Sequence, residues 1–135
     1  MAAVRRTAPV EARWLGGYRA SVSTRHFTVD VDEPPSAGGT DTGPMPTEYL
    51  LISLSSCFAL AIAHVARRDG VEVGPFSVTA QGTYDGPCLS DVELSIRLVG
   101  PVPAEMDTLL VKARRVCYVS NTLARQPSVT ARVID

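Results

Sequence analysis

The feature that most constrains this chain is an uncharged, largely apolar run from Tyr49 to Ala66. Thr47 and Glu48 suit a helix start, where the helix dipole favours a carboxylate, and a basic pair followed by Gly70 suits its end. Apolar side chains occur all round the predicted helix, which is typical of a helix covered on several sides. The run therefore predicts a long helix over Thr47–Asp69 that passes through the protein core.

A membrane-spanning helix is the alternative for this run, because its length and composition would suffice. Three serines and His64 interrupt the run, however, and its flanks are typical of soluble β structure. The chain has 135 residues, of which 45% are hydrophobic and 20% charged, and this composition excludes a disordered chain. Thirteen basic residues are matched by fourteen acidic ones, which argues against nucleic-acid binding.

The rest of the chain is typical of strands, turns and a second helix. Alternating apolar residues at Val92, Leu94, Ile96 and Leu98 indicate a strand with one buried face. The order of elements favours an α+β fold in one domain, residues 1–135, with about ten flexible residues at its start. The predicted elements are strands within Val10–Asp32, a long loop over Glu33–Met45, the long helix, strands Phe76–Tyr84 and Leu89–Val99, a helix from Pro103 to Cys117, a short helix Asn121–Arg125 and a strand Ser128–Ile134.

Three cysteines are the candidates for chemistry. Cys57 lies in the middle of the apolar helix and Cys117 at the end of the second helix. From their positions alone, Cys57 can be a small core residue, or the two can form a redox pair in which one thiolate attacks and the other resolves. An odd number of cysteines, without a Cys-x-x-Cys motif or a histidine pair, argues against a disulfide scaffold and a zinc site. Cys88, in the predicted hairpin turn, is interpreted as incidental.

Two motifs around Cys57 and Cys117 resemble the OsmC/Ohr family. The first is GGTDTGPMPTEYLL over residues 38–51, and the second is RVCYVSNTL over residues 115–123. They occur in the family order and at near-family spacing, and together they are specific. The resemblance extends from about Arg13 to the C-terminus.

This resemblance implies an OsmC-like α+β fold, with antiparallel sheets around a long buried helix plus a second helix, in an intertwined homodimer. It also implies a thiol-dependent peroxidase that reduces organic hydroperoxides without a cofactor. Cys57 matches the peroxidatic cysteine, which becomes a sulfenic acid, and Cys117 matches the resolving cysteine, which closes a disulfide. A dithiol reductant, of the lipoyl type in part of the family, then reopens that disulfide.

Peroxide cleavage needs a thiolate and a donor for the departing alkoxide, so an arginine is expected in the site. Arg19 and Arg25 are the candidates, both predicted to lie in the N-terminal strands, and Arg25 matches the OsmC-like branch better. The family's paired glutamate follows the helix-starting proline, where this sequence has Thr47. Glu48 comes one place later, about 100° around the helix, and is the candidate carboxylate if the partner subunit approaches it.

Several further side chains are candidates for an apolar substrate pocket, with core packing as the alternative for each. They include Thr47, Phe58 and Tyr49, beside Trp14 and Tyr18. His64 is two turns after Cys57 and could act as a base, although an ordinary helix histidine is the preferred interpretation.

The leading hypothesis is therefore an organic hydroperoxide reductase that uses Cys57 and Cys117. The main alternative is an OsmC-fold stress-related binding protein with weak or no peroxidase activity, which Thr47 favours. A structural dimer with inert cysteines and a Cys/His metal site are further alternatives. The first ten residues hold no apolar stretch that could serve as a signal peptide, so we expect a cytoplasmic protein. Its expected partners are a second copy, a hydroperoxide and a dithiol, but not a nucleic acid or a membrane.

Overall fold

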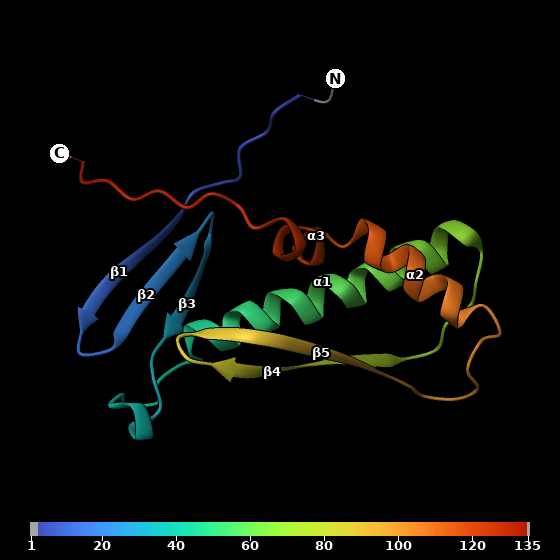
Figure 1. Ribbon diagram of the computed structural model, residues 1–135, viewed down its shortest axis with the longest axis horizontal. Helices are drawn as coiled ribbons and strands as arrows, with labels where there is room; N and C mark the ends of the chain where they lie inside the picture. The colour runs from blue at the N-terminus through green and yellow to red at the C-terminus, as the bar shows by residue number, and fades with distance from the viewer. Residues whose placement is uncertain (1–2, 135) are drawn as a thin grey trace. The chain divides into compact units, whose positions relative to one another are not determined.

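The computed structural model describes residues 3–134 and consists of two compact units, residues 1–50 and 51–135, which are described in turn. Three helices of the α type and five strands follow one another along the described chain (Figure 1). The α+β prediction is confirmed. Residues 3–9 precede the first strand without regular secondary structure, and the first two residues of the segment predicted to be flexible lie outside the described part.

The first unit is built on an antiparallel sheet of three strands in sequence order, β1 (Val10–Gly16), β2 (Arg19–Thr24) and β3 (Phe27–Val31). Its register pairs Ala12 with Val22 and Val22 with Val29, as expected for the predicted meander. Tight turns join the strands. Gly16 and Gly17 have positive φ values in the first turn, and so does Arg25 in the second (φ 51°).

The predicted loop over Glu33–Met45 is ordered and includes one short 3-10 turn, η1 (Pro35–Ala37). Gly39 packs against the Glu33 carbonyl so closely that a Cβ at this position would overlap the carbonyl oxygen. At Gly43 a Cβ would come within 2.5 Å of the Asp30 oxygen. Glycine is required at both positions because the backbone itself makes the close approach.

The long helix is α1 (Pro46–Asp69), one residue longer at its start than predicted. By length and composition it could cross a membrane, but six of its residues are buried, and five of them belong to the core cluster of the second unit. These buried residues are Leu54, Phe58, Ala61, Ile62, Val65 and Ala66. Their spacing of three and four places them along one side of the helix.

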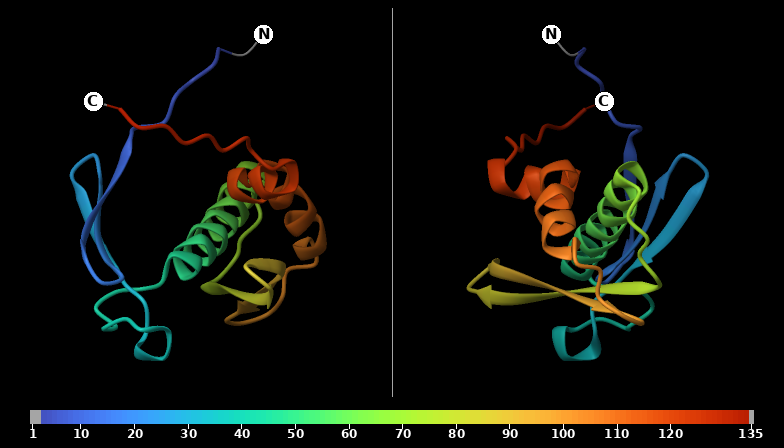
Figure 2. Two further views of the ribbon diagram at one scale, coloured as in Figure 1. Left: turned by 60° about the vertical axis from the view of Figure 1, so that its left-hand side comes forward. Right: turned by 90° about the vertical axis from the view of Figure 1, so that its right-hand side faces the viewer.

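The second unit packs a two-stranded sheet and a helix against this side of α1 (Figure 1 and Figure 2). Strands β4 (Phe76–Asp85) and β5 (Cys88–Leu98) form an antiparallel hairpin that matches the predicted pair. The predicted inward residues Val92, Leu94, Ile96 and Leu98 are all half-buried, while the residues between them are exposed. The core contains Leu94, Ile96 and Leu98 together with Met106, Leu109 and Ala113 of α2 (Met106–Val116).

Three predictions for the C-terminal part are wrong in detail. Helix α2 begins at Met106 rather than near Pro103, because Pro103 instead accepts a hydrogen bond from the Met106 N–H in a turn before it. Helix α3 (Tyr118–Arg125) begins three residues earlier than predicted. The strand predicted at Ser128–Ile134 is not formed in the described chain. A strand exists only where a neighbour pairs with its backbone groups, and a sequence pattern does not supply that neighbour.

Candidate active site

Cys57 lies at the edge of the buried side of α1. It follows Leu54 by three residues and precedes Ala61 by four, so the helical repeat places it beside both of these buried residues. Its side chain is half-buried and packs against the core of the second unit. The Cys57 side chain therefore contacts the protein core and is also partly accessible to solvent.

Cys117 lies at the corner between α2 and α3 and is fully buried in the same core. Its backbone leaves the helical region (φ −75°, ψ 106°), which ends α2 and starts α3. The Asn121 N–H donates to the Cys117 carbonyl at 3.0 Å, and the Asn121 side-chain amide donates to the Arg115 carbonyl at 3.0 Å. These two hydrogen bonds fix the corner and with it the position of the Cys117 sulfur.

Cys57 packs against the core cluster that contains Cys117, although sixty positions separate the two residues in the chain. Burial alone would raise the pKa of Cys117, because a buried thiolate loses its hydration. Contacts from the Ser120 hydroxyl and N–H, the Cys57 thiol and the Val119 N–H outweigh this effect and lower the pKa of Cys117. The thiolate is the reactive form of a cysteine, so the pair is suited to thiol chemistry.

Glu48 caps the start of α1. Its carboxylate accepts a hydrogen bond from the Met45 N–H at 3.0 Å, while the Met45 carbonyl accepts from the Tyr49 N–H at 3.0 Å. This is one half of a capping box, with Met45 as the residue before the first turn. The Tyr49 hydroxyl donates to the Asp30 carbonyl at 2.6 Å and joins the helix start to β3.

Arg25 was expected in a strand and lies instead in the turn between β2 and β3, where the chain reverses and φ is positive. Its guanidinium group stacks over the Phe27 ring, 5.0 Å from the ring centre, and the His26 ring lies 4.0 Å from the same ring. Within the described residues Arg25 forms no ion pair with Glu48. Arg19 starts β2 and is exposed.

The sequence profile of OsmC-like proteins matches residues 39–132, well over half of the chain. The chain belongs to the OsmC-like family. The match includes Cys57, Cys117 and the second part of the loop that precedes α1, residues 39–45. A search of curated proteins found no match.

Solved structures with the OsmC fold resemble this OsmC-like protein over most of its length. An OsmC-like protein of Mycoplasma pneumoniae is 16% identical, with 90% of this chain and 89% of that chain covered and a TM-score of 0.78. An organic hydroperoxide resistance protein of Elizabethkingia anophelis is 25% identical, with 91% of each chain covered and a TM-score of 0.72. An organic hydroperoxide resistance protein OsmC of Legionella pneumophila is 24% identical, with 90% of this chain and 91% of that chain covered and a TM-score of 0.69.

Asp32 is a buried residue of this OsmC-like protein that the sequence analysis missed. Its carboxylate, 1% exposed, accepts hydrogen bonds from the Thr40 hydroxyl at 2.6 Å, the Thr42 hydroxyl at 2.8 Å and the Glu33 N–H at 2.7 Å. The Thr40 bond is the strongest influence, and with the bonds from Thr42 and Glu33 it holds the pKa of Asp32 well below its usual range despite burial. An Asp at a strand end followed by Gly, Thr and Pro is the signal that could have revealed this role.

The remaining candidates differ widely in burial. Phe58 is 7% exposed and belongs to the core, whereas Trp14 and Tyr18 are mostly exposed. His64 is exposed on α1. Cys88 is exposed at the hairpin turn, where its thiol contacts the Asp85 carbonyl at 3.2 Å. In residues 3–134 no group of three or more His, Cys, Asp or Glu side chains could hold a metal ion.

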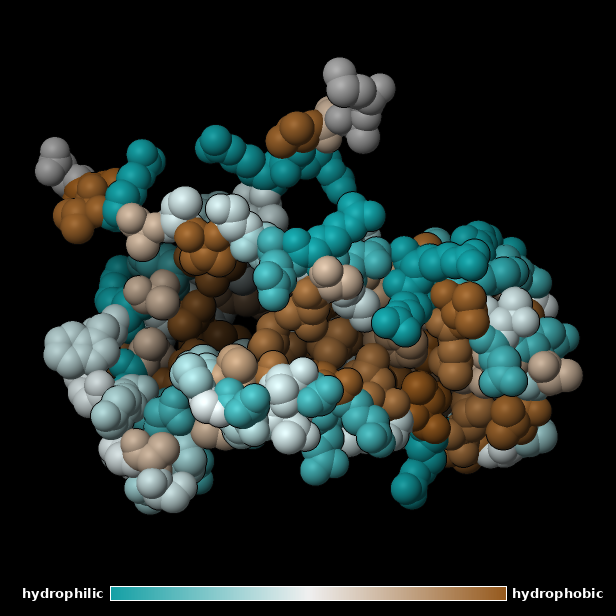
Figure 3. Space-filling view, in the orientation of Figure 1, coloured by the Kyte–Doolittle hydropathy of each residue, from teal (hydrophilic) through white to brown (hydrophobic). Residues whose placement is uncertain are grey.

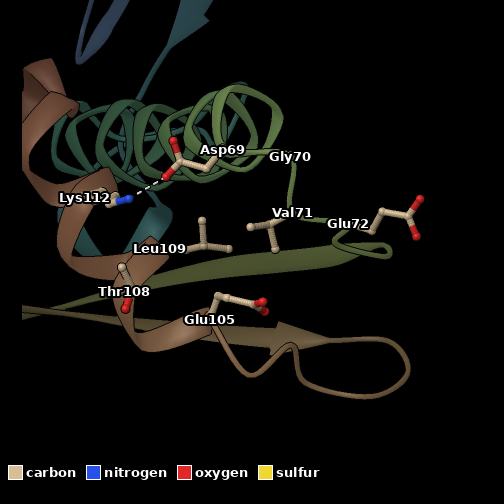
Figure 4. A pocket seen from close by; sticks show the side chains of 8 residues that line it. All are labelled: Asp69, Gly70, Val71, Glu72, Glu105, Thr108, Leu109 and Lys112. Atoms are coloured by element: carbon tan, nitrogen blue, oxygen red, sulfur yellow. Dashed lines mark hydrogen bonds and ion pairs between the residues drawn. The ribbon is translucent and has the colours of Figure 1, made fainter.

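A separate pocket of about 420 Å³ lies where the end of α1 meets the start of α2 (Figure 4). Val71 and Leu109 face each other in it, and Lys112 pairs with Asp69 at 2.6 Å. Arg68 and Lys112 lower the pKa of Asp69. Neither Cys57 nor Cys117 lines this pocket, so it is distinct from the thiol pair.

Proposed function

We propose that this OsmC-like protein reduces organic hydroperoxides through a cycle of Cys57 and Cys117. The observation that carries the proposal is the packing of the half-buried Cys57 against the core cluster that contains the fully buried Cys117. The name of the Elizabethkingia relative, an organic hydroperoxide resistance protein, supports the same substrate class. Cys57 is the thiol that a peroxide reaches, because Cys117 is 0% exposed.

In the proposed cycle the Cys57 thiolate attacks the terminal peroxide oxygen and breaks the O–O bond. Cys57 becomes a sulfenic acid, and the departing alkoxide takes up a proton to leave as an alcohol. The Cys117 thiolate then attacks the Cys57 sulfur and displaces hydroxide, which is protonated to water, and a disulfide forms. A dithiol of the lipoyl type reduces this disulfide by two exchange steps and is itself oxidised to a disulfide.

The other candidate residues keep the roles that the family resemblance predicts. Arg25 is proposed to stabilise the thiolate and the departing alkoxide, and Glu48 to orient the arginine. Thr47, Tyr49 and Phe58 are proposed to surround the substrate. The hydrogen bond from Met45 gives Glu48 a structural role as well, so substitution of Glu48 has to separate the two roles.

We also propose that the protein is a cytoplasmic homodimer. Leu60 of α1 is 71% exposed and Ile52 is 48% exposed. Apolar side chains are visible along the face where α1 runs (Figure 3). Exposed apolar side chains that gather along one helix are typical of a protein interface.

The experiment exposes the fully reduced protein to one equivalent of an alkyl hydroperoxide and maps the thiols by mass spectrometry. Trypsin places the three cysteines in separate peptides, residues 26–67, 69–97 and 116–125, so each possible disulfide has a distinct mass. We expect rapid loss of two thiols and a link between peptides 26–67 and 116–125. Cys57→Ser should abolish peroxide consumption, Cys117→Ser should stop at the sulfenic acid, and Cys88→Ser is the matched control. Survival of all three thiols would overturn the proposal.

A further inference from the structure

The turn between β2 and β3 holds Arg25 in a backbone conformation that arginine rarely adopts. Thr24 and Phe27 pair across the two strands, so Arg25 and His26 form a two-residue loop between them. Turns of this length favour glycine, asparagine or aspartate where φ is positive, yet Arg25 has φ 51°. Arginine is therefore a costly residue at this position, and a conformation of this kind indicates a role for its side chain.

The Phe27 ring supports the Arg25 side chain. The guanidinium carbon lies over this ring, 5.0 Å from its centre, and the centre of the His26 ring lies 4.0 Å from that of the same ring. A cation over an aromatic face is attracted by the negative face of the ring. Within residues 3–134 no carboxylate forms an ion pair with Arg25, so the Phe27 ring is the group that the structure places against its charge.

Stacking on a ring suits the part that Arg25 has in the proposed cycle. A planar guanidinium group that lies against an aromatic face carries its N–H groups at its edge, where they stay free to donate hydrogen bonds. The ring also restricts a long side chain before it binds, which lowers the entropy that binding costs. The Glu48 carboxylate, the other candidate support, accepts a hydrogen bond from the Met45 N–H instead.

We propose that Phe27 is a positioning residue, which keeps the Arg25 guanidinium oriented for the reaction of Cys57 with a peroxide. The inference rests on the proposed peroxidase cycle. In that cycle the Cys57 thiolate attacks the terminal oxygen, the O–O bond breaks, and the Arg25 N–H groups stabilise the departing alkoxide until it takes up a proton and leaves as an alcohol. Loss of the Phe27 ring should therefore slow this step, and only while Arg25 is present.

The first test is independent of peroxide. Protons held over an aromatic face resonate upfield, and the Arg25 Nε–H signal can be identified in NMR spectra because Arg25→Gln removes it. This signal should lie upfield in the reduced, unsubstituted protein and in Phe27→Tyr, which keeps the ring. In Phe27→Leu it should move to the position of an exposed arginine. Val29→Ala is the matched control, because Val29 is 41% exposed and Phe27 48%, and both side chains lie on the same face of β3.

The second test measures the rate of Cys57 oxidation by an alkyl hydroperoxide. In the Cys88→Ser, Cys117→Ser background the loss of the one remaining thiol reports this step directly. Phe27→Leu should slow it by roughly two- to fivefold, the effect of an exposed cation–π pair, and Phe27→Tyr should restore the rate. In an Arg25→Gln background, Phe27→Leu should have no further effect. Circular dichroism confirms that each variant is folded.

The outcomes separate the two proposals. If the unsubstituted protein keeps all its thiols after peroxide, the proposed function is wrong, and the role of Phe27 with it. If that protein is oxidised but Phe27→Leu reacts at the same rate, or leaves the Arg25 signal in place, only the role of Phe27 is wrong. The same holds if Phe27→Leu slows the reaction equally in the Arg25→Gln background, because the ring then acts on a group other than Arg25.

Discussion

Thr42 donates two hydrogen bonds to one carboxylate oxygen of Asp32, from its N–H at 3.1 Å and from its hydroxyl at 2.8 Å. Ten positions separate the two residues in the chain, and Thr40 of the same glycine-rich loop donates to Asp32 as well. The carboxylate at the end of β3 therefore binds this loop at two of its residues. The same loop ends at Met45, where α1 begins. Asp32 thus holds together the loop that leads to the start of α1.

Asp32→Asn should loosen this loop. An amide offers one acceptor oxygen where the carboxylate offers two, and its NH₂ group would face N–H and hydroxyl donors. We expect faster amide hydrogen exchange over residues 33–45 and a lower unfolding temperature. Asp41→Asn is the matched control, because Asp41 is exposed in the same loop with φ 57°, a conformation that Asn tolerates. Equal exchange in the two variants would contradict the role of Asp32.

The stability that Asp32 contributes should depend on pH. Its pKa is lower in the folded protein than in the unfolded chain, so the contribution is present above about pH 4 and is lost as the pH falls toward the folded pKa. The difference in unfolding temperature between the unsubstituted protein and Asp32→Asn should therefore shrink between about pH 5 and pH 2. Thermal unfolding at a series of pH values measures it. A difference that stays constant with pH would mean that the carboxylate is not the stabilising group.

Substitutions of Glu48 should separate its capping role from its predicted catalytic role. Glu48→Ala removes the acceptor for the Met45 N–H and should lower the free energy of unfolding by about 1 kcal/mol. Glu48→Gln keeps an acceptor oxygen and should be more stable than Glu48→Ala. The rate of Cys57 oxidation by an alkyl hydroperoxide then tests the charge. A fall in this rate for Glu48→Gln supports the carboxylate's predicted role, and an unchanged rate leaves Glu48 as a cap alone.

Leu60 should be buried between two copies of the chain. Its side chain is 71% exposed in one copy, and burial of a leucine side chain contributes about 1.5–3 kcal/mol. Leu60→Lys should therefore weaken the dimer by roughly tenfold or more, as light scattering over a concentration series would show. Leu60→Met, which keeps an apolar side chain of similar size, should remain dimeric. A dimer equally stable in both variants would place the interface elsewhere.

Local patterns predicted much of the fold. The uncharged run up to Ala66 predicted α1 to within one residue, and alternation from Val92 to Leu98 predicted β5 with its inward face. These signals succeed because helix and strand periodicities depend on neighbours along the chain. The predictions of a strand at Ser128–Ile134 and of a strand position for Arg25 were wrong. Strand pairing and the ends of strands depend on residues far away in the sequence.

The sequence by itself determined the α+β class, the long helix and the two motifs that place Cys57 and Cys117 in the OsmC-like family. Only the tertiary structure decided that Cys57 packs against the core that contains Cys117, that Cys117 is the fully buried one of the two, and that Asp32 binds the loop that follows it. The physical reason is that contact, burial and pKa depend on which distant groups share one small volume. That arrangement is set by the packing of α1 against α2 and the hairpin, and by the closure of the loop on Asp32.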